Sequence, residues 1–176
     1  MPRTFTSETS FPYPWLHTAR GVWYKYPNPH ATHVRSVDVL DQSICPRTGK
    51  LRTERILGVQ QNAPRWAAKL LGGGEETYVR EVIMLDPISN TVEMSSTNLS
   101  LSQYLLVKEY ITYTPSATGH ATDFRQKATI ECRGLQGVLA SAARKVEDWS
   151  FGRFGDNAAK GRLGMMEVLK GLDDRQ

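Results

Sequence analysis

The chain contains no long hydrophobic run, so no segment of it is predicted to cross a membrane. A spanning helix needs about 18 or more consecutive apolar residues, and the longest uncharged stretch, residues 94–107, is rich in serine, threonine and asparagine. Residues 1–15 lack the continuous apolar core of a secretory signal, and their single arginine is too few for a typical mitochondrial presequence. We therefore expect entry into any organelle to use another route.

Cysteine is scarce, and the common enzyme motifs are missing. Cys45 and Cys132 form no Cys-x-x-Cys motif, so we expect two reduced thiols and neither a disulfide framework nor a zinc site. The nucleophile elbow, the zinc-protease motif, the P-loop and the dinucleotide-binding glycine pattern are absent. His30 and His33 are three residues apart without a third ligand nearby. The sequence thus predicts no catalytic residue, no metal site and no enzyme.

Two adjacent carboxylates, Glu147 and Asp148, are the nearest approach to an acid–base pair. They would lie on neighbouring faces of a helix, which does not aim both at one substrate. We expect them to pair with Arg144 or Lys145, or with a partner protein.

The chain is mildly basic. Its net charge is +4 and its isoelectric point about 9.1, which favours anionic partners such as phospholipid surfaces or nucleic acid. No nucleic-acid signature is present, so no nucleic-acid partner is predicted. The surplus lies mainly in residues 47–80, where seven basic residues accompany three acidic ones. A solvated strand face is the alternative explanation for this cluster.

At 176 residues the chain is long enough for one sizeable core, and residues 1–172 are predicted to form a single domain followed by a polar tail at 173–176. Alternating patterns bounded by proline, glycine and asparagine turns predict seven strands, at residues 4–11, 33–41, 51–59, 77–86, 91–98, 104–114 and 122–132. Helical patterns occur at residues 15–25, 62–74 and 134–172.

Short connections between the strands predict an antiparallel, strongly curved sheet. In the last strand, alternate residues from Phe124 to Cys132 face one way and the charged residues between them face solvent. The long C-terminal helix is the element available to bury the other face. The predicted fold class is therefore α+β, with the sheet gripping the C-terminal helix and a cavity between them.

The C-terminal helix carries a stripe that changes character along its length. Apolar residues at positions 135, 138, 139, 142, 146 and 149 recur in steps of three and four, and the stripe continues at about 100° per residue to Arg153, Asn157 and Lys160. This favours a helix that forms one wall of a cavity whose far end binds an anion. An amphipathic helix with a frayed, solvated C-terminal half is the alternative.

Residues 62–74 interrupt the strand pattern. Pro64 is suited to start a helix that carries Trp66 and two leucines, with Arg65 and Lys69 beside them and three glycines at the end. These features are typical of a mobile lid or a loop that dips into a membrane. A connecting helix packed on the sheet edge is the alternative.

Basic residues that would face the predicted cavity are candidate ligands for an anionic headgroup. Strand phase turns Arg55 inward together with Leu57 if Leu57 and Val59 mark the core side, and a register slip of one residue would reverse this. Each such cation by itself is more often a surface charge, and burying it unpaired would cost several kcal/mol. A cavity that accepts an anionic headgroup would offset this cost. The candidates from phase and position are Lys25, His33, Arg55, Lys145, Arg153 and Lys160.

Four segments, YPNPHATHV, TERILGVQQNAPRWAAKLLGG, VREV and KVEDWSFGRFGDNAAKGRLGM, resemble the PRELI domain family. The resemblance extends from about residue 5 to residue 172, with the motifs in matching order and spacing. It implies a START-like helix-grip fold, with a curved seven-stranded antiparallel sheet around a long C-terminal helix that together enclose a lipid cavity. It also implies a non-enzymatic phospholipid carrier of the mitochondrial intermembrane space.

The resemblance further implies a heterodimer with a small twin Cys-x9-Cys helical protein, transient contact with anionic membranes, and bound phospholipid as cargo without any cofactor. By position it assigns the polar part of the cavity to Lys25, His33, Lys145, Asn157 and Lys160. It assigns the lid loop to Asn62, Ala63, Pro64, Arg65, Trp66, Ala67, Ala68, Lys69, Leu70, Leu71, Gly72 and Gly73.

Within the family, the segments TERILGVQQNAPRW and TNLSLSQYLLVKEYITYTP are similar to those of the Slowmo-type branch, which transfers phosphatidylserine. Gly58 stands where a basic residue is expected in a phosphatidic-acid carrier, although Lys25 and Lys160 remain available to a phosphate. A phosphatidic-acid carrier is therefore one alternative. A non-transferring interaction module, docking a partner through Glu147 and Asp148 over a vestigial cavity, is another.

Overall fold

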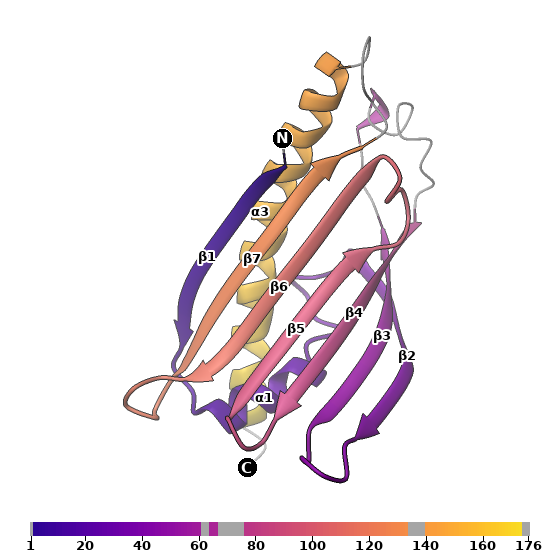
Figure 1. The fold of residues 1–176 in the computed structure, drawn as a ribbon. Coiled ribbons are helices and arrows are strands. Elements are labelled where there is room, and N and C mark those ends of the chain that lie inside the picture. Colours follow the sequence, from indigo (N-terminus) through magenta and orange to yellow (C-terminus); the bar gives the residue numbers. More distant parts are fainter. Residues whose placement is uncertain (1, 61–63, 67–75, 134–139, 174–176) are drawn as a thin grey trace.

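The computed structural model describes residues 2–60, 64–66, 76–133 and 140–173. Seven strands and two long helices account for most of these residues (Figure 1). In chain order they are β1 (Arg3–Phe11), α1 (Trp15–Trp23), β2 (Val34–Ile44), β3 (Leu51–Gln60), β4 (Glu76–Asp86), β5 (Thr91–Asn98), β6 (Leu105–Pro115), β7 (Thr122–Cys132) and α3 (Ala140–Asp173).

The strands form one sheet in the order β1-β7-β6-β5-β4-β3-β2, and every neighbouring pair is antiparallel. Helix α3 runs along the sheet behind it, and α1 lies across its lower end (Figure 1). Both helices contact the sheet and each other. The predicted START-like helix-grip architecture is confirmed.

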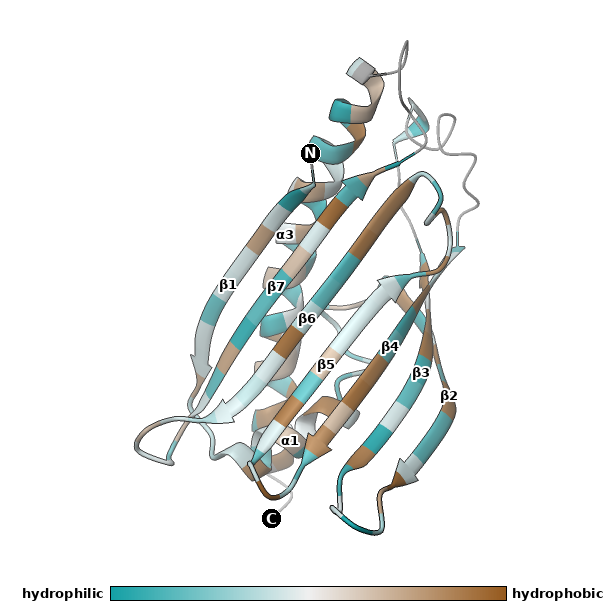
Figure 2. Ribbon diagram, viewed as in Figure 1, coloured by the Kyte–Doolittle hydropathy of each residue, from teal (hydrophilic) through white to brown (hydrophobic). Residues whose placement is uncertain are grey.

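Alternation along the strands decides which side chains face α3, and Figure 2 shows hydrophobic and hydrophilic residues alternating along several strands. In β7, Phe124, Ala128 and Ile130 are buried, whereas Arg125 and Lys127 are exposed. This confirms the phase predicted for the last strand. The edge strand β2 is the exception: it has two register shifts with β3, and most of its residues are exposed.

An apolar core fills the end of the molecule that contains α1. The rings of Phe11, Tyr113 and Phe124 form its centre, with centroids 5.7 Å apart between Phe11 and Phe124 and 5.2 Å apart between Tyr113 and Phe124. Met165 and Leu169 of α3 pack into the same core and are 1% and 0% exposed. The alternative in which the C-terminal half of the helix is frayed is therefore wrong, because that half is anchored beneath α1.

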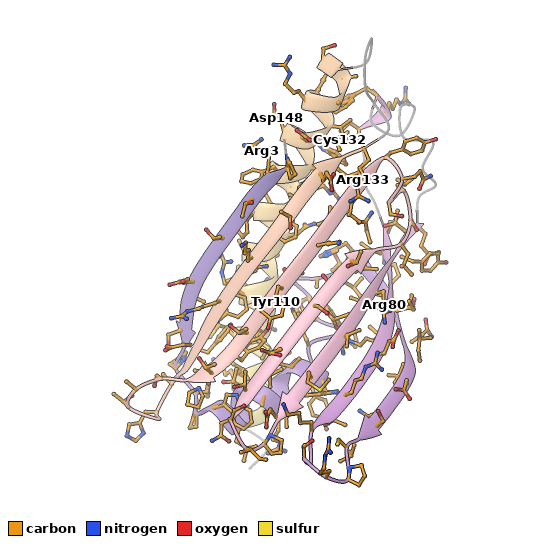
Figure 3. All side chains as sticks on the ribbon, in the orientation of Figure 1. Arg3, Arg80, Tyr110, Cys132, Arg133 and Asp148 are labelled. Atoms are coloured by element: carbon orange, nitrogen blue, oxygen red, sulfur yellow. The ribbon has the colours of Figure 1, made fainter. Side chains whose placement is uncertain are left out.

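At the other end, acidic residues of α3 attach the helix to the sheet. Asp148 pairs with Arg3 of β1, and the two side chains meet in Figure 3. Glu147 Oε1 accepts a hydrogen bond from the backbone N–H of Cys132 at 3.1 Å. The expected pairing of these carboxylates with residues of their own helix is not what the structure shows. Both bind within the chain, to groups on β1 and β7.

The outer face of the sheet is charged and solvated. Arg52 and Arg80 both pair with Glu54 there, and Arg80 lies on the face turned to the viewer in Figure 3. Much of the basic cluster in residues 47–80 is thus a solvated strand face, as the alternative interpretation proposed. Cys45 and Cys132 are free thiols, as expected. No helix of the described residues is long and apolar enough to cross a membrane.

Candidate functional site

A cavity of about 250 Å³ lies between the concave face of the sheet and α3. It is far larger than the roughly 10–15 Å³ that one water molecule needs, so bulky side chains have not collapsed it. This weakens the alternative of a vestigial cavity. Its apolar lining comes from β3, β4, β5, β6 and α3, and includes Leu57, Val59, Val79, Met94, Leu105, Val107, Ile111, Phe154 and Met165.

Four of the predicted headgroup ligands line this cavity together. Lys25 and His33 come from the segment between α1 and β2, whereas Arg153 and Asn157 lie one turn apart on α3. The guanidinium of Arg153 lies 5.8 Å from the ring centroid of Trp149, which also lines the cavity. Segments distant in sequence thus contribute polar groups to one chamber, beside its apolar lining.

The end of α1 directs Lys25 into the cavity. The helix closes with a tight turn in which the Tyr24 N–H donates to the carbonyl of Gly21 at 3.1 Å. The side-chain amide of Asn28 then donates to the carbonyl of Lys25 at 2.6 Å. Gly161 of α3 packs beside the ammonium, since a Cβ there would lie 3.6 Å from Lys25 Nζ, an ordinary contact distance.

Gly164→Ala is expected to lower the free energy of unfolding by about 1–3 kcal/mol, the usual cost of overpacking. An added Cβ would meet Asn28 side-chain atoms at 2.6, 2.8 and 2.9 Å. Asn28 is held in place because its Oδ1 also accepts from the backbone N–H of His30 and Ala31. Urea denaturation measures the change.

Gly152→Ala is the matched control on the same helix. Nothing lies within 4 Å of its added Cβ, so the gain in helix propensity should raise the free energy of unfolding by up to about 1 kcal/mol. If both variants were equally destabilised, the close contact between α3 and the Asn28 turn would be refuted.

Lys25 remains a cation despite its position. Burial would lower its pKa, but Tyr26, Tyr113, Glu81 and Glu109 raise it more, and the net pKa is above its ordinary value. Lys25 therefore presents a permanent positive charge to a ligand.

His33 is expected to be neutral at pH 7. Burial lowers its pKa below the ordinary 6.5, and the neighbouring cations Arg153, Lys160 and Lys25 lower it further. A neutral imidazole can donate or accept a hydrogen bond, and an anionic ligand nearby would raise its pKa again.

The lowered pKa of His33 predicts a loss of stability in mild acid. Because the folded-state pKa lies below the unfolded value, the unfolded chain binds the proton more readily in this range. The contribution of His33 is complete above about pH 6.5 and declines as the pH falls through the folded-state pKa. Unfolding curves of the lipid-free protein between about pH 7.5 and 5.5 should therefore fall less steeply for His33→Phe than for the wild type. His120→Gln, in an exposed turn, should leave the slope unchanged. An unchanged slope for His33→Phe would contradict the prediction.

Arg55 faces inward, as strand phase predicted. It is 3% exposed and pairs with Glu81 of β4, which is also 3% exposed. Its guanidinium lies 5.8 Å from the ring centroid of Tyr26. Glu81 contributes to the cavity lining, whereas Arg55 lies behind it. Binding of a headgroup by Arg55 stays a prediction.

Lys145 and Lys160 do not join the residues that line the cavity. Both are exposed; Lys145 Nζ lies 4.6 Å from the ring centroid of Trp66, and Lys160 acts on His33 only through its charge. The lining of α3 advances in steps of four from Trp149 to Met165, a drift of about 40° per step. Position 161 therefore faces the cavity in place of position 160, which corrects the predicted stripe.

Three residues of the predicted lid loop, 64–66, belong to the described part of the chain. The Trp66 ring meets that of Trp149 edge-on at 6.1 Å between centroids, so this point of the loop contacts the cavity wall. Arg65 is exposed. The remaining predicted lid residues, 62–63 and 67–73, lie outside the described residues.

Apart from Arg55, the sequence interpretation missed a row of polar residues across the sheet beneath the cavity. Strand register aligns Arg55, Glu81, Ser96 and Glu109 on β3 to β6, and we call these four residues the polar row. Apart from Arg55, all line the cavity. The signal was present for the two carboxylates, because Glu81 lies between Val79 and Ile83 on its strand face, and Glu109 between Val107 and Ile111.

The comparisons with known proteins agree with this architecture. The PRELI-like family model matches residues 17–175. The chain belongs to the PRELI-like family. It is 38% identical over 170 residues to the protein UPS2, mitochondrial, of Saccharomyces cerevisiae, covering 96% of this chain and 73% of that protein. It is 37% identical over 171 residues to a UPS-like protein of Schizosaccharomyces pombe, covering 97% and 91%.

Two solved structures share the fold of this PRELI-like chain at low sequence identity. TTHA0849 from Thermus thermophilus superposes with a TM-score of 0.62 at 14% identity, covering 96% of this chain and 98% of that one. The Zhui aromatase/cyclase from Streptomyces sp. R1128 gives 0.60 at 10% identity, covering 99% and 96%. At these identities the likeness establishes the helix-grip fold alone.

In this PRELI-like protein, the residue type at position 58 gives no information about which headgroup binds. Leu57 and Val59 line the cavity, so position 58 alternates to the other face of β3. A Cβ there would meet Ser36 Oγ at 2.5 Å and Glu76 Oε1 at 2.8 Å. A basic side chain at this position would point away from the cavity, which corrects the inference drawn from the sequence.

The described part of the chain contains no group of three or more residues suited to hold a metal ion. His30, one of the two histidines considered, pairs with Glu167 of α3 at 2.8 Å. His33 instead lines the cavity.

Proposed function

We propose that this protein is a non-enzymatic carrier of an anionic glycerophospholipid, with phosphatidylserine favoured, between the outer and inner mitochondrial membranes. The observation that carries the proposal is the apolar cavity with Lys25, Arg153 and Asn157 at one end. Acyl chains and an anionic headgroup need this combination in a single chamber. Membership in the PRELI-like family supports it.

The proposed mechanism is exchange without chemical reaction. Each methylene group of an acyl chain that leaves water for the cavity contributes about 0.8 kcal/mol. The ammonium of Lys25 and the amide of Asn157 offer hydrogen bonds to the phosphate, which are stronger where one partner is charged. The lipid is cargo, so it must enter and leave intact.

Family membership and the resemblance support the proposed location and partner. Two relatives, UPS1 and UPS2 of Saccharomyces cerevisiae, are named mitochondrial. We extend this to the intermembrane space and to a heterodimer with a small twin Cys-x9-Cys helical protein. Exposed Arg65 would favour brief contact with anionic membranes.

Phosphatidylserine is favoured because the chain is similar to the Slowmo-type branch. A relative named slowmo homolog, from Dictyostelium discoideum, is 29% identical over 170 residues, covering 96% of this chain and 72% of that protein. Identity is 38% to UPS2 and 32% to UPS1. A phosphatidic-acid carrier is the second candidate, because the cation Lys25 also suits a bare phosphate. A docking module that uses Glu147 and Asp148 is disfavoured, since both bind within the chain.

Transfer between donor and acceptor liposomes tests the proposal, using the full chain co-expressed with a twin Cys-x9-Cys partner. Faster transfer of phosphatidylserine than of phosphatidic acid is the expected result. Faster phosphatidic-acid transfer would retain the carrier and reverse the choice of lipid. If the protein moved neither lipid and carried none after purification, the carrier function would be refuted.

A further inference from the structure

The polar row interrupts an otherwise apolar sheet face, and one of its carboxylates lacks a cationic partner. Glu81 pairs with Arg55. Glu109 instead accepts hydrogen bonds from two neutral donors, the Ser96 hydroxyl at 3.0 Å and the Gln126 amide. Within the described residues, no cationic nitrogen lies within 4.0 Å of the Glu109 carboxylate. Glu109 thus places a carboxylate held by neutral donors on the cavity wall, and Lys25 interacts with it through charge.

Beside Glu109, the cavity lining contains buried acceptors without donors. The amide of Gln126 must turn its NH₂ to the carboxylate, so its Oε1 points elsewhere. This oxygen has no partner within the described residues, and Gln126 is only 6% exposed. Ser150 Oγ on α3, in a residue 7% exposed, is also unpartnered there. Both residues line the cavity.

The register of the sheet relates the position of Glu109 to the part of α3 that carries Ser150. Glu109 is aligned with Ala128 of β7, and Ala128 with Phe5 of β1. The Phe5 ring packs on Phe151 and Phe154 of α3, with centroids 6.1 and 5.3 Å away. The turn of α3 that carries Ser150 therefore lies against β1 at the end of this register line, and Ser150 lines the same cavity as Glu109 and Gln126.

The balance of charge distinguishes between headgroups. Glu81 pairs with Arg55, and Glu81 and Glu109 both act on Lys25 through their charge. Arg153 and Arg162 also belong to the cavity lining, so the charge that distinguishes headgroups is that of the immediate surroundings of Glu109. A bare phosphate placed here would add negative charge beside the unpaired carboxylate of Glu109. A phosphate joined to an ammonium would add a neutral pair, and the ammonium N–H groups would supply donors to the unpartnered acceptors.

We propose that Glu109, Gln126 and Ser150 form an acceptor pocket for the ammonium group of an amino phospholipid, with Lys25 binding the adjacent phosphate. This inference rests on the proposed carrier function and specifies its ligand class. An acyl chain alone at this level would remove water from a carboxylate without replacing its hydrogen bonds. The pocket therefore selects lipids that carry a primary amine.

The test compares four lipids with identical acyl chains, two with an ammonium (phosphatidylserine and phosphatidylethanolamine) and two without (phosphatidic acid and phosphatidylglycerol). Glu109→Gln, in the full chain with its partner, should slow liposome transfer of the amino lipids by at least about tenfold. Transfer of the other two should stay within about twofold. Glu93→Gln, an exposed carboxylate on β5, is the matched control and should change none of the four rates.

An equal fall for all four lipids, or no change for any, would overturn the ammonium pocket while leaving the carrier function intact. If the wild-type protein transferred none of the four lipids, both the proposed carrier function and the proposed ammonium pocket would be refuted. Gln126→Met keeps the experiment decisive if Glu109→Gln does not fold. It removes the unpartnered acceptor and the amide donor to Glu109 but no charge, and the same selective loss is expected.

Discussion

Replacing Lys25 by methionine is expected to slow phospholipid transfer by about tenfold or more. The ammonium of Lys25 is a permanent cation that lines the cavity beside Asn157 and Arg153. A hydrogen bond to a charged group contributes about 1.5–3 kcal/mol, which corresponds to about 10- to 150-fold in affinity. Methionine keeps most of the side-chain length and removes the charge. Liposome transfer and the amount of co-purified lipid measure the effect.

Lys127→Met is the control for this prediction, because Lys127 is exposed on the outer face of β7. It should leave transfer unchanged. Thermal melting of both variants separates a loss of ligand binding from a loss of folding, since Lys25 also offsets the charges of Glu81 and Glu109. A well-folded Lys25→Met protein that transferred lipid at the wild-type rate would show that Lys25 is not a headgroup ligand.

Glu81→Met is expected to lower the free energy of unfolding by about 3–5 kcal/mol. Removing one partner of a buried ion pair leaves the other charge without compensation in a medium that solvates it poorly. Arg55 is 3% exposed, and its Nη2 has no hydrogen-bond acceptor among the described residues even with Glu81 in place. Urea denaturation of the lipid-free protein gives the value.

The double variant Arg55→Met with Glu81→Met should recover most of this loss, because it replaces the pair by apolar groups of similar size. Glu8→Met, which removes the partner of Arg125 from a pair with both side chains more than 70% exposed, should change stability little. If Glu81→Met cost no more than Glu8→Met, the Arg55–Glu81 pair would not be acting as a buried pair.

Local patterns predicted the elements well, because alternation and turn chemistry act over a few residues. The predicted strands at 91–98 and 122–132 have the same limits in β5 and β7. The predicted helix at 15–25 ends earlier, at Trp23. The tight turn at Tyr24 shortens it, and this is what allows Lys25 to enter the cavity.

The residues of the site were harder to predict, because which of them line the cavity depends on how the sheet and α3 pack against each other. A uniform helical stripe leads from Arg153 to Asn157 and Lys160, whereas the cavity lining follows Arg153, Asn157 and Gly161. A sheet twists as it crosses a helix, so the face of α3 that meets the cavity drifts around the helix axis. Over several turns this drift moved Lys160 outside, although its residue type and spacing were correct.

By itself, the sequence determined the order of the seven strands and of the two helices α1 and α3, the inward position of Arg55, and the family to which the chain belongs. These depend on period, turn residues and motif order, all of which are local. The tertiary structure alone decided which cations share the cavity, and that Asp148 binds Arg3. It also decided that Glu109 faces the cavity with only neutral donors as hydrogen-bond partners among the described residues. The physical reason is that the partners of a charge come from strands and helices far apart in the chain, and a local pattern carries no information about them.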